Sequence, residues 1–140
     1  MGSSEVIPQA GAIPYRRLDG GGLEVCLVTA SNGGWTIPKG MIDPGHTARQ
    51  MAEIEALEEA GVIGSAEEES VGFFNYEKFD RVYRVEVFAM PVDRVLDTWA
   101  EDDERERAWF PASDAANSAR LPQMGDVIRL FIERESERPA

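Results

Sequence analysis

The chain has few of the features that mark secreted and membrane proteins. Its 140 residues include a single cysteine, Cys26, so no internal disulfide can form, which agrees with a reducing compartment. No apolar run approaches the roughly 20 residues that a membrane span needs. The first residues, MGSSEVIPQA, lack the charged start and long apolar stretch of a signal peptide. We therefore expect a cytoplasmic protein with no membrane partner.

Positive charge is also scarce. There are 14 Lys and Arg residues against 26 Asp and Glu, which gives a formal net charge of −12. Proteins that bind a nucleic-acid duplex through its backbone rely on a basic surface, so we expect no such partner. A phosphorylated small molecule is still compatible with this charge, because a few arginines around a bound cation reverse the local field.

The length predicts one domain over residues 1–140, with flexible ends at 1–8 and 136–140. We find no internal repeat and no interdomain linker. Strands are expected at 8–17, 24–30, 71–77 and 81–92, a short strand near 108–110, one helix at 48–60, and two helices after residue 111. This mixed order favours an α+β layered domain over a doubly wound sheet. Cys26 lies in a strand-like apolar run, where a small buried hydrophobe is expected.

The stretch GMIDPGHTARQMAEIEALEEAGV, residues 40–62, places three carboxylates close together on a predicted helix. Thr47 followed by Gln50 is a capping-box pattern and Gly61 fits the position just past a helix end, so the helix should run from Ala48 to Ala60.

Within it, Glu55, Glu58 and Glu59 occupy neighbouring positions on one face, where like charges repel by a few tenths of a kcal/mol, roughly, per pair. Either this face is solvated or a cation sits there, and carboxylate oxygens suit Mg²⁺ or Mn²⁺.

The same stretch resembles the signature of the Nudix hydrolases: a glycine, five residues, Glu, seven residues, then Arg-Glu-aliphatic-any-Glu-Glu-any-Gly-aliphatic. The five matching positions are Gly40, Glu55, Glu58, Glu59 and Gly61. Two positions depart, because His46 stands at the first glutamate and Ile54 at the arginine. The resemblance implies the Nudix fold, an α/β/α sandwich with a mixed sheet flanked by helices. It also implies a metal-dependent pyrophosphohydrolase that acts on acid anhydrides.

The resemblance also assigns roles. Glu55, Glu59 and the carbonyl of Gly40 would bind Mg²⁺, with Mn²⁺ as the alternative, and Glu58 would be the general base. In the family the signature arginine helps to hold the glutamates, so Ile54 bears directly on metal affinity and rate. A non-catalytic module that binds a phosphorylated ligand is the alternative from another class of protein.

The likeness extends over residues 9–133. The segment WTIPKG is similar to one in diadenosine polyphosphate hydrolases and their diphosphoinositol polyphosphate relatives. The run from 80 to 115, with Trp99, Arg105 and Trp109, resembles the diphosphoinositol polyphosphate phosphohydrolases more specifically. A diphosphoinositol polyphosphate or a dinucleoside polyphosphate is the implied substrate. A nucleoside triphosphate, ADP-ribose or a nucleotide sugar is the alternative.

A polyphosphate needs guanidinium and ammonium partners, since arginine forks match phosphate oxygens bidentately. Lys39 adjoins the signature glycine, and Lys78 lies at a predicted hairpin bend near Arg81. Arg105 and Arg81 correspond to basic positions of the diphosphoinositol branch, and Arg16 ends the first strand. We expect these five residues to bind substrate, and we expect a monomer or a homodimer.

Overall fold

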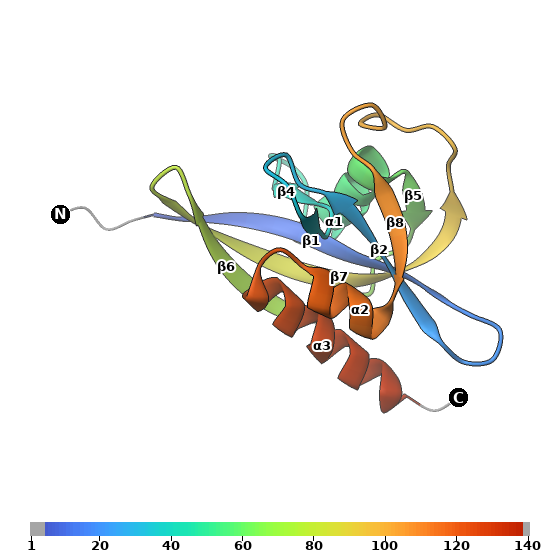
Figure 1. Cartoon of the computed structure of the whole chain (residues 1–140). Helices are drawn as coiled ribbons and strands as arrows, with labels where there is room; N and C mark the ends of the chain where they lie inside the picture. The colour runs from blue at the N-terminus through green and yellow to red at the C-terminus, as the bar shows by residue number, and fades with distance from the viewer. Residues whose placement is uncertain (1–4, 139–140) are drawn as a thin grey trace.

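The computed structural model describes residues 5–138 and shows a mixed β-sheet with helices packed on both of its faces (Figure 1). In chain order the elements are β1 (Val6–Arg17), β2 (Leu23–Thr29), β3 (Trp35–Thr36), β4 (Lys39–Met41), α1 (Ala48–Glu55), the π-helix η1 (Ala56–Ala60), β5 (Val62–Gly64), β6 (Gly72–Lys78), β7 (Arg81–Val95), β8 (Arg107–Pro111), α2 (Ala112–Ser118) and α3 (Pro122–Ser136).

The centre of the sheet is a parallel pair formed by β1 and β7. The pairing runs in register from Val6 opposite Val82 to Tyr15 opposite Pro91. Every other pairing among the described strands is antiparallel: β1 with β2 and β4, β2 with β3 and β8, and β7 with β5 and β6. The predicted mixed sheet of an α+β protein is therefore confirmed.

Two hydrophobic cores lie on opposite faces of this sheet because successive side chains of a strand point to opposite sides. On β1, Ile13 joins the core beneath α2 and α3, while its neighbour Ala12 joins the core beneath α1. Cys26 lies in the second core, fully buried, and desolvation raises the pKa of its thiol to about 12. The predicted α/β/α sandwich is confirmed, and none of the helices in residues 5–138 is long and apolar enough to cross a bilayer.

The ends of the chain differ in part from expectation. Residues 1–4 and 139–140 lie outside the described range. Inside it, β1 begins at Val6, so part of the segment 1–8 expected to be flexible is a strand paired with β7. At the other end, α3 includes Ser136, the first residue of the second segment expected to be flexible.

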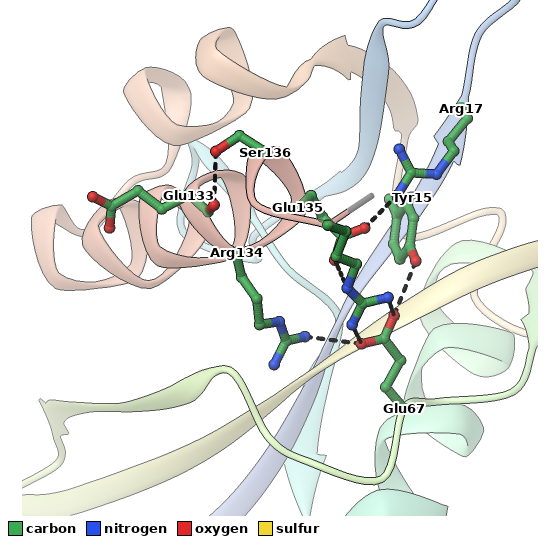
Figure 2. Close-up of polar contacts among 8 residues, drawn as sticks. Tyr15, Arg17, Glu67, Glu133, Arg134, Glu135 and Ser136 are labelled. Atoms are coloured by element: carbon green, nitrogen blue, oxygen red, sulfur yellow. Dashed lines mark hydrogen bonds and ion pairs between the residues drawn. The ribbon is translucent and has the colours of Figure 1, made fainter. Parts of the chain in front are cut away.

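Helix α3 is tied to the sheet by a network of charged side chains (Figure 2). The carboxylate of Glu135 is buried and pairs with Arg17 at 2.5 Å and with Arg138 at 3.1 Å. Glu67, just after β5, accepts a hydrogen bond from the Tyr15 hydroxyl at 3.0 Å and pairs with Arg138 at 2.8 Å. Desolvation and the bond to Glu67 raise the pKa of Tyr15 to about 12. The network therefore links β1, α3 and the segment after β5.

Candidate metal and substrate site

The predicted helix from Ala48 to Ala60 is present, but it has two geometries: α1 is α-helical and η1 is π-helical. Its start is the predicted capping box, in which the Thr47 hydroxyl accepts from the Gln50 N–H at 3.1 Å and the Gln50 side chain accepts from the Thr47 N–H at 2.9 Å. Its end is Gly61 in the left-handed region, with φ 64°. Short π-helical turns are frequent at functional sites, and this one carries Glu58 and Glu59.

The three glutamates occupy three different environments. Glu59 is buried, Glu55 is half-buried, and Glu58 is exposed. The expectation that all three share one face is therefore only partly met. Glu58 and Glu59 are consecutive residues of the helix, so their side chains point in different directions, Glu59 into the protein and Glu58 to solvent.

The Glu59 carboxylate is buried beside β4 and the segment before β8. One oxygen accepts from the Lys39 backbone N–H at 3.2 Å, and the other lies 3.5 Å from Arg105 Nη2. The pKa of Glu59 is raised to about 8. Desolvation is the largest cause and the nearby charge of Glu55 adds to it, while Arg105 and the Lys39 N–H act in the opposite direction. A buried carboxylate of this kind holds a proton unless a cation takes the proton's place.

Glu55 lies against the backbone of Gly40. Strand β4 is fixed by pairing with Gln9–Gly11 of β1, which places Ala10 opposite Gly40. A Cβ atom at position 40 would come within 2.5 Å of the Glu55 carboxyl carbon, so only glycine leaves room for this approach. Burial raises the pKa of Glu55, its hydrogen bond with Glu59 lowers it, and the charge of Glu58 raises it.

Glu55, Glu59 and the backbone of Gly40 could together supply part of the coordination of a divalent cation. Nowhere in residues 5–138 are three His, Cys, Asp or Glu side chains gathered as a ready-made cage. What the chain offers is two adjacent carboxylates, the half-buried Glu55 and the buried Glu59, beside the backbone of Gly40. Mg²⁺ is commonly bound in this manner, through one or two carboxylates with the remaining positions left to water and substrate phosphate. His46 is exposed ahead of the helix and outside this group.

A polar cleft of about 390 Å³ opens beside Glu59. Its walls come from the loop after β2, from the end of β6, and from the connection between α2 and α3. Four cationic side chains line it: Lys39, Lys78, Arg105 and Arg120. Burial lowers the pKa of Lys39, although the charge of Glu59 counteracts this. In a chain of net charge −12, this concentration of positive charge marks a place for an anion.

Three of the five predicted substrate-binding residues therefore lie together: Lys39, Lys78 and Arg105. Arg81 is opposite Lys78 at the β6–β7 hairpin but does not line the cleft, and its role stays a prediction.

Arg16 does not fit the expectation. It lies six residues along β1 from Ala10, the partner of Gly40, which is about 20 Å at strand rise. Its guanidinium pairs with Glu24 at 2.8 Å and covers the ring of Trp109 at 4.0 Å. The position of Arg16 at the far end of the strand therefore separates it from the cleft.

Two cleft residues were not predicted from the sequence. Arg120 follows α2, donates its backbone N–H to the Trp35 carbonyl at 2.9 Å, and bonds the Asn32 side chain through its guanidinium. Tyr76 accepts from Lys39 Nζ at 3.3 Å and donates to Gln9 at 2.8 Å. No motif marks either residue, because both reach the cleft through tertiary packing of segments far apart in sequence.

The segment 96–107, which consists of the connection from β7 to β8 and the first residue of β8, caps the end of the glutamate helix (Figure 1). The last carbonyls of a helix have no partners within it and must find donors elsewhere. Two backbone N–H groups of this segment donate to the helix end: Glu101 to the Glu58 carbonyl at 3.1 Å and Leu96 to the Gly61 carbonyl at 2.8 Å. Two side chains do the same: Trp99 Nε1 donates to the Glu59 carbonyl at 2.9 Å and Arg107 Nη1 to the Ala60 carbonyl at 2.9 Å. We call residues 96–107 the clamp segment. Its contacts fix the backbone that carries the carboxylates.

Comparison with known proteins agrees with this geometry. The NUDIX domain family matches residues 8–131. Nudix hydrolase 21, chloroplastic, of Arabidopsis thaliana is 30% identical, with 91% of this chain and 67% of that protein aligned. The asymmetrical bis(5′-nucleosyl)-tetraphosphatase of Caenorhabditis elegans is 29% identical, with 90% and 94% aligned.

A solved structure, a binary complex of C. elegans Ap4A hydrolase, superposes with a TM-score of 0.78 at 26% identity and covers 95% of this chain and 100% of that one. Family match, relatives and fold all agree with the signature read at residues 40–62. The chain belongs to the Nudix hydrolase family.

Proposed function

We propose that this chain is a Mg²⁺-dependent pyrophosphohydrolase that cleaves a phosphoanhydride bond in a dinucleoside polyphosphate, with a diphosphoinositol polyphosphate as the second candidate. One observation carries the proposal: the carboxylate pair of half-buried Glu55 and buried Glu59, set against Gly40, adjoins a cleft lined by four cationic side chains. The carboxylates suit a divalent cation, and the cleft suits a phosphate chain.

The chemistry divides between the helix and the cleft. A divalent cation bound by Glu55, Glu59 and the Gly40 carbonyl would neutralise phosphate charge and lower the pKa of an attacking water. Glu58, exposed and close enough to Glu55 to raise the pKa of that carboxyl, would accept the proton of the water. Lys39 and Lys78 would hold the phosphate chain and stabilise the negative charge that develops as the anhydride bond breaks.

The relatives support the order of the two candidate substrates. The C. elegans proteins that align over nearly their whole length are named as a bis(5′-nucleosyl)-tetraphosphatase and an Ap4A hydrolase. We therefore place the dinucleoside polyphosphate first. The sequence-based likeness to the diphosphoinositol branch rests on the segments around Trp99 and Arg105. In this structure Trp99 caps the glutamate helix and Arg105 pairs with Glu59.

Three expectations about partners and place stay predictions: a monomer or homodimer, no partner among nucleic-acid duplexes or membranes, and a cytoplasmic location. The A. thaliana relatives include proteins named as chloroplastic and mitochondrial, so membership of the family does not by itself assign a compartment.

The proposal is tested by product release at millimolar Mg²⁺ from five compounds: diadenosine tetraphosphate, a diphosphoinositol polyphosphate, ADP-ribose, a nucleotide sugar and a nucleoside triphosphate. Glu58→Gln is assayed alongside, with Glu133→Gln as the matched control, because Glu133 is an exposed glutamate of α3. We expect turnover of one of the first two compounds, lost in Glu58→Gln and kept in Glu133→Gln.

Turnover of only the last three compounds would retain the hydrolase and refute the proposed substrate class. Binding without turnover of any compound would refute the enzyme and favour the phosphate-binding module.

A further inference from the structure

The guanidinium group of Arg105 is held by three acceptors from three different segments. Its Nε donates to Glu101 Oε1 at 2.7 Å and its Nη1 donates to the Thr29 carbonyl at 2.8 Å. Its Nη2 lies 3.5 Å from Glu59 Oε2. Each of the three nitrogens therefore points to a different partner: one in the clamp segment, one at the end of β2, and one on the glutamate helix.

This arrangement makes the guanidinium a fixed group. The fork is planar and presents its N–H donors in a rigid geometry, so three directed contacts leave it little freedom. Glu101 is itself anchored, because its backbone N–H donates to the Glu58 carbonyl at 3.1 Å. Burial alone would lower the pKa of Arg105, but the hydrogen bond to Glu101 and the charge of Glu59 raise it, so the group stays cationic.

Glu59, in contrast, has few partners of its own. Within residues 5–138, Arg105 is the cation that forms an ion pair with its carboxylate, whose side chain is only 8% exposed. On the glutamate helix itself, position 54 is an isoleucine and offers no charge. Apart from Glu55, the groups that hold the Glu59 carboxylate lie outside the helix: Arg105 at one oxygen and the Lys39 N–H at the other.

We propose that Arg105 is a positioning residue, which holds the Glu59 carboxylate in the orientation where it can share a divalent cation with Glu55. This inference rests on the proposed function. It differs from the role of substrate contact that the sequence suggests for Arg105, because it concerns the enzyme before any substrate is bound. Partners of this kind, one step away from the cation, typically change metal affinity or activity by about 10- to 100-fold when removed.

The two roles predict opposite signs for metal binding. If Arg105 acted only as a positive charge in the cleft, its removal would leave the carboxylates more negative and would tighten binding of a cation. If it positions Glu59, its removal frees the carboxylate to turn away from this orientation, and binding weakens.

The test is a calorimetric titration of Mn²⁺ into the protein without substrate, for wild type, Arg105→Ala and Arg105→Lys. Arg129→Ala is the control, since Arg129 also pairs with a carboxylate of its own segment, Asp126 at 3.1 Å, but on α3. We expect Arg105→Ala to weaken Mn²⁺ binding by about 10-fold or more. Arg105→Lys, which keeps the charge without the fork, should recover only part of this loss, and Arg129→Ala should match wild type.

Unchanged or tighter Mn²⁺ binding by Arg105→Ala, together with a raised KM for substrate, would overturn the inference and leave Arg105 as a substrate contact. If Arg105→Ala does not fold, Arg105→Lys decides alone: affinity equal to wild type would contradict positioning by the fork. Failure of the wild-type protein itself to bind Mn²⁺ is a separate result, because it would remove the proposed metal site and the function built on it.

Discussion

At the scale of single residues, the main feature of the site is the burial of Glu59, because removing a carboxylate from water is energetically unfavourable. The folded metal-free protein has to keep this carboxyl protonated or pair it with a cation, and Arg105 alone does not bring its pKa back to the ordinary value. Binding of a divalent cation would satisfy the same carboxylate.

Stability of the metal-free protein should therefore depend on pH in a defined direction. The pKa of Glu59 is raised from 4.5 to about 8, so between these values the folded state binds a proton that the unfolded chain releases. The contribution of Glu59 to the free energy of unfolding is therefore greatest below pH 4.5, and it falls as the pH rises towards 8. The loss should be on the order of a few kcal/mol, and Glu55, whose pKa is also raised, adds to it.

Urea unfolding in the presence of a chelator at pH 5, 6.5 and 8 measures this effect. Glu59→Gln should remove most of the decline, because glutamine stays neutral across the whole range. A decline of equal size in wild type and variant would show that Glu59 is ionised in the folded protein and that the decline has another origin.

A second prediction at this scale concerns Gly40. Its replacement by alanine would place a Cβ within 2.5 Å of the Glu55 carboxyl, but that carboxyl is the end of a flexible side chain and can move away. We expect Gly40→Ala to change the free energy of unfolding by less than about 1 kcal/mol and to lower kcat/KM by about 10-fold or more, because Glu55 no longer reaches its metal-binding position.

The control for this prediction is Gly72→Ala, where the nearest atom to the new Cβ is Leu130 Cδ1 at 3.6 Å, an ordinary contact distance. It should preserve both stability and activity. Activity of Gly40→Ala equal to wild type would show that the close approach of Glu55 to the backbone is not needed for the reaction.

Sequence patterns predicted some of these residues well and others poorly. The cap at Thr47, the end at Gly61 and the spacing of the glutamates depend on local geometry, which the sequence specifies. Which glutamate is buried, and what Arg105 and Arg120 contact, depends on segments that meet only after folding. Arg16 does not line the cleft, and its distance along β1 from Gly40 follows from the pairing register, which the sequence did not provide.

At the scale of elements, the glutamate helix is held at both ends by different means: the capping box at its start and the clamp segment at its end. Sequence analysis predicted the helix limits. It did not predict that Trp99 would donate its indole N–H to the Glu59 carbonyl. The contact spans 40 residues and has no local signature.

Helix α3 offers a test of how a buried ion pair contributes to the fold. Glu135 is buried between Arg17 and Arg138, while the two arginines are about half exposed. Replacing a buried charge by an apolar residue of similar size is often close to neutral, whereas removing the partners of a buried charge is costly. We expect Glu135→Met to change stability by about 1 kcal/mol or less, and the double variant Arg17→Met with Arg138→Met to lose about 3 kcal/mol.

Urea unfolding of both variants at pH 7 gives the comparison. If Glu135→Met were as destabilising as the double variant, the cost would come from lost packing or hydrogen bonding and not from an uncompensated buried carboxylate.

At the scale of the whole molecule, an acidic protein keeps a cluster of four cationic side chains beside a buried glutamate, Glu59. Helices α1 and η1 pack on one face of the sheet and α2 and α3 on the other (Figure 1). The cleft is lined by the loop after β2, the connection between α2 and α3, and Glu59 of η1, so it draws on both layers. The layers followed from the order of elements in the sequence. The cleft did not, because it needs the relative positions of loops far apart in the chain.

Ionic strength should affect substrate binding more than the chemical step. Contacts between a polyphosphate and partly exposed cations are screened by salt, with a Debye length that falls from about 10 Å at 0.1 M to about 3 Å at 1 M. We expect KM to rise several-fold from about 0.05 to about 0.5 M NaCl while kcat changes by less than about two-fold. A steady-state titration of substrate at each salt concentration measures both constants. A constant KM would show that the cleft cations do not bind the phosphate chain.

The most direct test of the proposed site is the Mg²⁺ dependence of diadenosine tetraphosphate hydrolysis by wild type, Glu55→Gln and Glu59→Gln, with Glu133→Gln as the control. A metal site formed by Glu55 and Glu59 predicts saturable Mg²⁺ activation of wild type and control, and a loss of at least about 100-fold in kcat/KM for each site variant at saturating Mg²⁺. Hydrolysis by wild type that continues in excess chelator, or that survives both substitutions, would contradict it.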